Sequence, residues 1–315
     1  MHTKAALIVI KILLVAGSSL VSLHTQANAP DASSAPAQAQ TIPSTPPPTA
    51  ERVEFGSLDT TGLFSSRPVM IRGYLLASQS IDPTAAAVLN PACEGLLAPG
   101  GSQVRGKYMR MARFLHGRGL TVLMIDGFTP RGFEEACSSN RIDHIQRLKD
   151  SLGGLAYLRS RSNVAAERVI TVTWGNTGGI EGMNKDANYL PKAEAGFMAA
   201  VMYYPECGKV GRNFSPSGPI QVFVGGKDQW NPAVLCQQLA QRQEAGSAPF
   251  LMKLYPEAYH SFDLPMGEPM LNPYNPSKGW VGRNASATAD SFMTVDAFLS
   301  SLPGIPPKPE RKLQP

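Results

Sequence analysis

The stretch IQVFVGGKD, residues 220–228, indicates the fold class most directly. Its first five residues form an almost wholly apolar run, which is the pattern of a strand covered on both faces. The run ends in two glycines and Asp228. Functional groups gather at such strand ends in open α/β sheets. Asp228 is therefore a candidate functional acid, although an Asp that follows Gly is also a common turn residue.

Apolar runs and helical patterns alternate on both sides of this stretch. Further strands are predicted over 69–76, 85–89, 120–125, 169–173, 197–204 and 250–255. Helices are predicted over 108–116, 143–159, 232–246 and 287–299. This alternation predicts the α/β class, with a mostly parallel central sheet, helices on both faces and right-handed crossovers.

His260 lies in the loop after the last predicted strand. A histidine at this point can act as a general base, and a carboxylate such as Asp228 can orient it. The chain order, with the acid before the histidine, also suits a hydrolase of the Ser…Asp…His order. Either residue alone has an ordinary structural explanation, but the two together favour a catalytic pair.

Four stretches resemble the dienelactone hydrolase family. They are VGGKDQWNPA at 224–233 with Cys236, YPEAYHSFD at 255–263, IDGFTPRG at 125–132 with Cys137, and YYPEC at 203–207. The resemblance implies an α/β-hydrolase fold, with Asp228 as catalytic acid and His260 as catalytic base. It also implies a small-molecule ester or lactone as substrate, anionic ones included, and no cofactor.

The chain has four cysteines, and on the sequence alone three disulfide pairings are open. No CxxC motif or Cys/His cluster has the spacing of metal ligands, so no metal site is predicted. The cysteines shared with the family imply two bridges, Cys93–Cys137 and Cys207–Cys236.

The chain departs from the family where the nucleophile is expected. The family places a Ser or Cys at the apex of G-x-S-x-G or G-x-C-x-G, whereas this sequence has TWGNTGG at 173–179. An ungapped match puts Gly175 at the apex, which leaves no side chain to form an acyl-enzyme. A shifted register makes Thr177 the nucleophile with the Gly178 amide nearby, but a β-branched residue fits such a turn poorly. We favour the ungapped register.

The turn that stabilises the oxyanion is altered as well. The stretch NPACEG at 90–95 has Pro91 where the family has histidine. Proline lacks an N–H, so the amides of Ala92 and Cys93 remain as candidate donors.

Three further side chains are candidates for the pocket wall. Trp174 and Trp230 flank the predicted elbow and acid, and are expected to line an apolar pocket. Arg131 is a candidate ligand for an anionic group, although an arginine in such a loop can equally bind backbone carbonyls.

The two ends of the chain differ from its body. Residues 1–29 have a basic start, an apolar run and the small-residue site Ala27-Asn28-Ala29, which is the pattern of a signal peptide. A Pro/Ala/Ser linker is predicted over 30–50, the hydrolase-like domain over 51–303 and a Pro/Lys-rich tail over 304–315. We therefore expect an exported protein, periplasmic or secreted, with no membrane span after signal removal.

Charge excludes one class of partner. Without residues 1–29 the chain has 27 basic and 24 acidic residues, and it has no basic stripe with interleaved aromatic residues. Nucleic-acid binding is therefore not predicted. Three hypotheses remain open: ester or lactone hydrolysis, a non-catalytic protein that keeps the fold to bind a ligand or partner, or a purely structural component of the cell envelope tethered by residues 30–50.

Overall fold

The computed structural model describes residues 50–60, 68–139, 141–185, 189, 196–211 and 213–307. The predicted signal peptide, most of the linker and residues 308–315 of the predicted tail lie outside them. Ile305, just past the predicted domain end at 303, is buried against the core.

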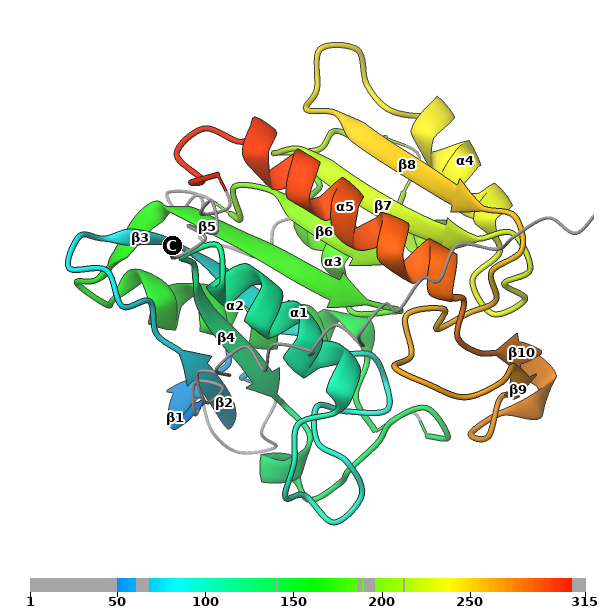
Figure 1. Cartoon of the computed structure of the whole chain (residues 1–315), viewed down its shortest axis with the longest axis horizontal. Coiled ribbons are helices and arrows are strands. Elements are labelled where there is room, and N and C mark those ends of the chain that lie inside the picture. The colour runs from blue at the N-terminus through cyan, green and yellow to red at the C-terminus, as the bar shows by residue number, and fades with distance from the viewer. Residues whose placement is uncertain are drawn as a thin grey trace, which may run out of the picture. The chain divides into compact units, whose positions relative to one another are not determined.

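An eight-stranded sheet forms the centre of the domain (Figure 1). In sheet order its strands are β1 (Glu51–Gly56), β2 (Met70–Leu76), β4 (Thr121–Asp126), β3 (Thr84–Asn90), β5 (Val164–Trp174), β6 (Ala200–Tyr203), β7 (Ile220–Gly225) and β8 (Phe250–Tyr255). β2 is antiparallel to β1 and β4, and all other neighbours are parallel. The predicted, mostly parallel sheet is therefore confirmed. The sequence pattern did not reveal β1, an edge strand whose charged residues Glu51, Arg52 and Glu54 are exposed.

Helices cover both faces of the sheet, as predicted. In Figure 1, α1 (Gly106–His116) and α5 (Ala285–Ser301) lie in front of it. They bury apolar residues such as Met111 and Val295 in one core cluster. α2 (His144–Arg159), α3 (Gly179–Gly182) and α4 (Ala233–Gln241) contribute to a second core cluster. Short 3-10 turns occupy Thr129–Arg131, Cys207–Lys209 and Pro276–Lys278.

The parallel strands bring distant segments of the chain to one edge of the sheet. β3, β5, β7 and β8 run in the same direction, so the loops that follow them leave from the same edge. These loops carry the altered turn at 90–95, the elbow at 175–178, Asp228 and His260. This is the edge at which α/β sheets place their binding sites.

An excursion between β8 and α5 lies beside the loop that carries His260. It contains the hairpin of β9 (Met270–Leu271) and β10 (Trp280–Val281). Val281 forms a β-bridge with His260, and the Gly282 amide donates to the His260 carbonyl at 3.1 Å. Several exposed hydrophobic side chains belong to this excursion: Met266, Met270, Leu271 and Trp280.

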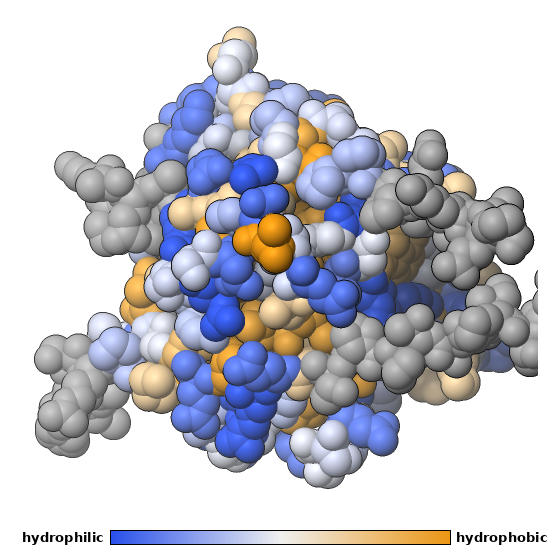
Figure 2. Space-filling view, turned by 60° about the vertical axis from the view of Figure 1, so that its left-hand side comes forward, coloured by the Kyte–Doolittle hydropathy of each residue, from blue (hydrophilic) through white to orange (hydrophobic). Residues whose placement is uncertain are grey.

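On the face that Figure 2 shows, hydrophobic side chains are interspersed among hydrophilic ones. Among the described residues, no helix has the length and apolarity that crossing a membrane requires.

Candidate active site

His260 and Asp228 lie side by side at the carboxyl edge of the sheet. His260 Nδ1 lies 2.8 Å from Asp228 Oδ2, and both side chains are buried. Because an ionised carboxylate only accepts hydrogen bonds, Nδ1 is the donor and Nε2 is left free to take a proton. Asp228 Oδ1 accepts from the amides of Trp230 and Asn231, each at 2.8 Å. The carboxylate is thus fixed by bonds on both oxygens.

Two aromatic rings hold the imidazole in place. Trp230 stacks on His260 with ring centroids 4.8 Å apart, and Tyr204 packs against it at 4.4 Å. Trp230 also lines the cavity described below, as expected. Packing on these rings restricts the rotation of the imidazole and supports one orientation toward the cavity.

Gly175 occupies the apex of the turn after β5. Its φ is +63°, and its amide donates to the Tyr203 carbonyl at 2.9 Å. A Cβ built on Gly175 would meet a single atom of the described residues outside its chain neighbours within 4 Å, the Ala92 Cβ at 3.7 Å. The position therefore has room for a small side chain or a water molecule, and it lines the same cavity as His260.

The alternative register is not what this turn adopts. Thr177 is buried and does not line the cavity, and among the described residues its hydroxyl has no hydrogen-bond partner. Gly178, whose amide was the other candidate oxyanion donor in this register, does not line the cavity either. Gly178 packs against α2, where an added Cβ would lie 2.5 Å from the His144 carbonyl oxygen.

The backbone amides near Gly175 differ in their partners. The Ala92 amide donates to the Tyr108 hydroxyl at 2.8 Å, so this candidate oxyanion donor is already engaged. Among the described residues, the amides of Cys93 and Asn176 have no protein acceptor. Both residues line the cavity. The pair of available donors is therefore Cys93 and Asn176, and not Ala92 or Gly178.

Two other expectations about the pocket are wrong. Trp174 is fully buried beneath the turn, where its indole N–H donates to Asp263 Oδ2 at 2.8 Å. Arg131 forms a bidentate pair with Asp150, at 2.8 Å for each bond, and does not line the cavity. Trp174 thus points into the core, and Arg131 is engaged by a carboxylate away from the cavity.

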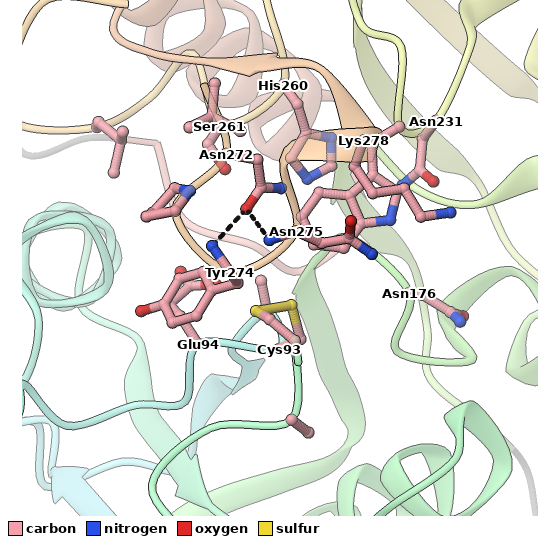
Figure 3. A pocket seen from close by; sticks show the side chains of 18 of the residues that line it. Cys93, Glu94, Asn176, Asn231, His260, Ser261, Asn272, Tyr274, Asn275 and Lys278 are labelled. Carbon is pink, nitrogen blue, oxygen red and sulfur yellow. Dashed lines mark hydrogen bonds between the residues drawn. A yellow bond between two sulfur atoms is a disulfide. The ribbon is translucent and has the colours of Figure 1, made fainter. Parts of the chain in front are cut away.

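His260, Gly175, Asn176 and Cys93 line a cavity of about 800 Å³. Figure 3 shows His260, Asn176 and Cys93 among the side chains that line it, together with Asn272, Tyr274 and Asn275 of the β9–β10 excursion. Its volume lies within the usual range for small-molecule sites.

Sequence reasoning missed most of the polar residues that line this cavity, Asn272 and Arg147 among them. Asn272 is buried, and its Oδ1 accepts from the amides of Tyr274 and Asn275 at 3.0 and 3.2 Å. Arg147, on the first turn of α2, is also buried and lines the cavity. The sequence did contain an indication of Arg147: it is a cationic residue near the start of the helix predicted over 143–159, and this helix begins at the edge of the sheet where the cavity lies.

An ion pair joins the altered turn to α1: Lys107 is buried, and the Glu94 side chain is 14% exposed. Lys107 Nζ and the Tyr108 hydroxyl both donate to Glu94 Oε1 at 2.5 Å, and Lys107 also donates to the Tyr204 hydroxyl at 3.0 Å. Burial alone would raise the pKa of Glu94. The Lys107 ammonium and the two hydrogen bonds outweigh it and lower the pKa to about 2. Glu94 is therefore ionised at neutral pH.

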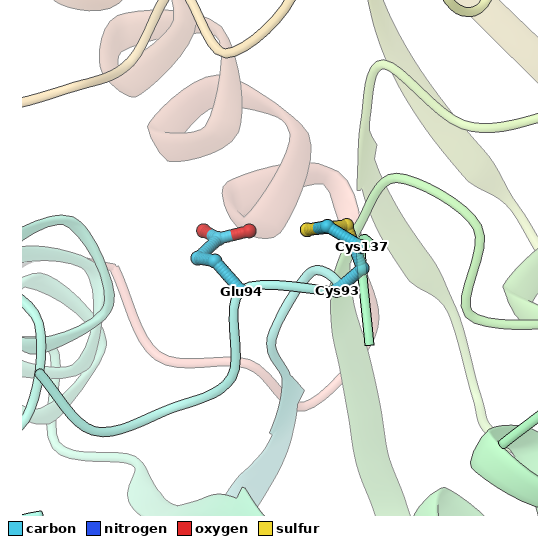
Figure 4. Close-up of side chains that lie close together, drawn as sticks. All are labelled: Cys93, Glu94 and Cys137. Carbon is cyan, nitrogen blue, oxygen red and sulfur yellow. A yellow bond between two sulfur atoms is a disulfide. The ribbon is translucent and has the colours of Figure 1, made fainter. Parts of the chain in front are cut away.

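Both disulfides have the pairing that the family resemblance implied. Cys93 is bonded to Cys137 and Cys207 to Cys236. Cys93 and Cys137 lie close to the Glu94 carboxylate (Figure 4). These three residues do not offer metal ligands, since the two sulfurs are bonded to each other and Glu94 is paired with Lys107.

Comparison with known proteins gives one family match. The family model described as the dienelactone hydrolase family matches residues 136–302, just over half of the chain. None of the curated proteins matches the sequence.

Solved structures of esterases share the fold. A paraoxon-phosphorylated esterase 2 of Thermogutta terrifontis aligns with a TM-score of 0.57 and 13% identity, over 83% of this chain and 97% of that one. The propionate-bound form of an esterase from the same organism has a TM-score of 0.56 at 13% identity, with 83% and 97% coverage. A provisionally named dienelactone hydrolase of Klebsiella pneumoniae has a TM-score of 0.50 at 15% identity, with 80% and 99% coverage. At these identities the likeness shows the fold, and the expected α/β-hydrolase fold is confirmed.

Proposed function

This chain belongs to the dienelactone hydrolase family, and from that premise we propose that it hydrolyses a small carboxylic ester or lactone with water as the attacking nucleophile. One observation carries the proposal. The buried His260–Asp228 pair faces the same cavity as Gly175, a position with a left-handed turn and no side chain. A water molecule in the space beside Gly175 takes the place of the missing hydroxyl.

The reaction follows from the donors and acceptors around this space. The water oxygen attacks the acyl carbon while His260 Nε2 takes its proton, and Asp228 stabilises the resulting imidazolium. The oxyanion accepts hydrogen bonds from the amides of Cys93 and Asn176. The bond from the acyl carbon to the leaving oxygen then breaks, and His260 returns the proton to that oxygen. An ester yields an acid and an alcohol, and a lactone yields a hydroxy acid.

The test is turnover of activated short-chain esters and a simple lactone by the oxidised chain from residue 30. We expect hydrolysis that falls at least about a hundredfold in His260→Ala and in Asp228→Asn. His116→Ala is the matched control, because His116 bonds the Ala77 carbonyl away from the cavity. Intact-mass spectra taken during turnover should contain no acyl adduct.

Two results would contradict the proposal. Equal rates of hydrolysis by the unsubstituted protein and His260→Ala would show that His260 is not the general base of the reaction. An acyl adduct on Thr177 would mean that a covalent nucleophile operates after all.

A second candidate function is binding without catalysis. Two observations favour it: Gly175 has no nucleophilic side chain, and Tyr108 engages the Ala92 amide. This function predicts no turnover together with saturable binding of a small ester, measured by calorimetry. Loss of that binding in Trp230→Ala, whose side chain lines the cavity, would support it.

We further propose that the protein is exported to the periplasm or secreted. The two disulfides are compatible with an oxidising compartment, and residues 1–29 have the signal-peptide pattern. Sequencing the N-terminus of the protein recovered from outside the cytoplasm should begin at Pro30. Recovery of the full-length chain from the cytoplasm alone would contradict export.

A further inference from the structure

Arg147 connects the two segments that carry the unengaged amides. Its Nη1 donates to the Asn176 carbonyl oxygen at 2.6 Å, and its Nη2 donates to the Pro91 carbonyl oxygen. The residue is only 4% exposed. Asn176 belongs to the elbow after β5, and Pro91 to the altered turn after β3. One guanidinium thus bridges two loops that are 85 residues apart in the chain.

The charge of Arg147 has no carboxylate partner. Among the described residues, no Asp or Glu oxygen lies within 4.0 Å of its guanidinium. Burial lowers its pKa to about 10, so the group stays cationic at neutral pH. A buried charge without an ion-pair partner is costly for folding. Its two carbonyl bonds, the Phe128 ring 5.4 Å from the guanidinium carbon, and the more distant carboxylates of Glu94 and Asp150 offset part of that cost.

The peptide between Pro91 and Ala92 is held from both sides. Arg147 binds its carbonyl oxygen, and the Tyr108 hydroxyl accepts from its N–H at 2.8 Å. Tyr108 in turn donates to Glu94 at 2.5 Å, which directs a hydroxyl lone pair toward Ala92. The next residue, Cys93, is held through its carbonyl, which accepts from the Ala136 amide at 2.7 Å. The Cys93 N–H therefore emerges from a backbone that is bonded on each side.

We propose that Arg147 is a positioning residue that sets the spacing of the Cys93 and Asn176 amides as one oxyanion hole. This inference rests on the proposed function, because it assigns the two amides to the oxyanion of the same reaction. Donors stabilise a developing charge most when they are already in place before the reaction. A planar guanidinium spans two carbonyls with one rigid fork, which a lysine ammonium does not reproduce.

The test places a serine at position 175, so that the oxyanion hole can be studied through labelling of that serine and not through ester turnover. Gly175→Ser adds a hydroxyl at the apex, and the rate of its labelling by a fluorophosphonate probe depends on the base and on the oxyanion donors. In this background we compare Arg147→Met and Arg147→Lys. The matched control is Arg159→Met, since Arg159 is on the same helix and also donates to two carbonyls, Ala166 and Gly196, away from the cavity.

We expect the maximal labelling rate to fall at least about tenfold in both Arg147 variants, while the probe concentration that gives half of that rate stays the same. Arg159→Met should change neither quantity. Thermal melting of each variant checks folding, and Arg147→Lys is the decisive variant if Arg147→Met does not fold.

Three outcomes would overturn the inference. They are a labelling rate in Arg147→Lys equal to that of the control, a loss confined to probe binding, and no labelling of Gly175→Ser at all. The proposed function is judged separately, by turnover in the protein that retains Gly175. It therefore stands or falls independently of Arg147.

Discussion

At position 175 the backbone has a left-handed conformation that glycine adopts without steric cost. Any residue with a Cβ is strained there, and a β-branched residue most of all. The turn thus has the left-handed backbone of a nucleophile elbow without the side chain that such an elbow presents. A hydroxyl can be placed at this position only at the expense of backbone strain.

Gly175→Ser should therefore be less stable than the unsubstituted protein, by about 1–2 kcal/mol, because serine must adopt the left-handed conformation. Urea denaturation measures this difference. Gly211→Ser is the control, since Gly211 has no left-handed φ and an added Cβ meets none of the described residues within 4 Å. Equal changes in the two variants would contradict the strain argument.

Thr177→Val should raise the free energy of unfolding by about 1 kcal/mol and leave turnover unchanged. The substitution keeps the shape of the side chain and removes a buried hydroxyl that has no partner among the described residues. Thr171→Val is the contrast, because the Thr171 hydroxyl donates to the Val88 carbonyl at 3.3 Å. A large loss of turnover in Thr177→Val would make Thr177 a candidate nucleophile again.

At the scale of elements, α2 brings a cationic residue to the site because its start is well defined. Asp143 caps the helix and accepts from the Gln146 amide at 2.7 Å, while the Gln146 side chain accepts from the Asp143 amide at 3.1 Å. This reciprocal cap sets where the helix begins. Arg147 follows directly after Gln146, so the cap also sets where its guanidinium lies.

Asp143→Ala should cost about 1 kcal/mol of stability and also slow ester hydrolysis, because the first turn of α2 loosens around Arg147. Chemical denaturation and steady-state kinetics measure the two effects. Asn284→Ala is the matched control: Asn284 caps α5, accepts from the Ala287 amide at 3.0 Å and does not line the cavity. It should lose similar stability with no change in turnover. Equal kinetics in the two variants would refute a role for this cap in the site.

At the scale of the molecule, loops from distant parts of the sequence are joined by covalent and ionic links. The Cys93–Cys137 bridge closes a separation of 44 residues beside the cavity. The Lys107–Glu94 pair links α1 to the turn after β3, and Lys107 extends the link to Tyr204 after β6. The edge of the sheet is therefore held together where the proposed catalytic groups meet.

The acid stability of the whole domain should depend on Glu94. Its pKa is about 2 in the folded protein against an ordinary 4.5. Its ionised form thus stabilises the fold above pH 4.5, and this contribution is lost as the pH falls from 4.5 to about 2. Glu94→Gln should lack this contribution. The unsubstituted protein should therefore exceed Glu94→Gln in unfolding free energy by roughly 3 kcal/mol at pH 7, and this difference should shrink as the pH falls from 4.5 to about 2. Denaturation of both proteins at a series of pH values measures the difference, and a difference that does not change with pH would contradict the lowered pKa of Glu94.

Much of the fold was predictable from local patterns. Apolar runs and helical periodicity identified seven of the eight strands of the sheet and all of the longer helices. This was possible because the residues that a helix or strand buries recur in the sequence with the period of that element. Edge strand β1 was missed because its outward residues are charged. The β9–β10 hairpin was missed because its strands have two residues each.

By itself, the sequence determined the order of the elements, the strand ends at which Asp228 and His260 stand, and the absence of a side chain at Gly175. Each of these depends on a residue and its near neighbours. Only the tertiary structure decided that Arg147 lines the cavity and Arg131 does not, and that Tyr108 engages the Ala92 amide. Those outcomes depend on which partners lie within about 3 Å in space, and residues far apart in the chain supply them.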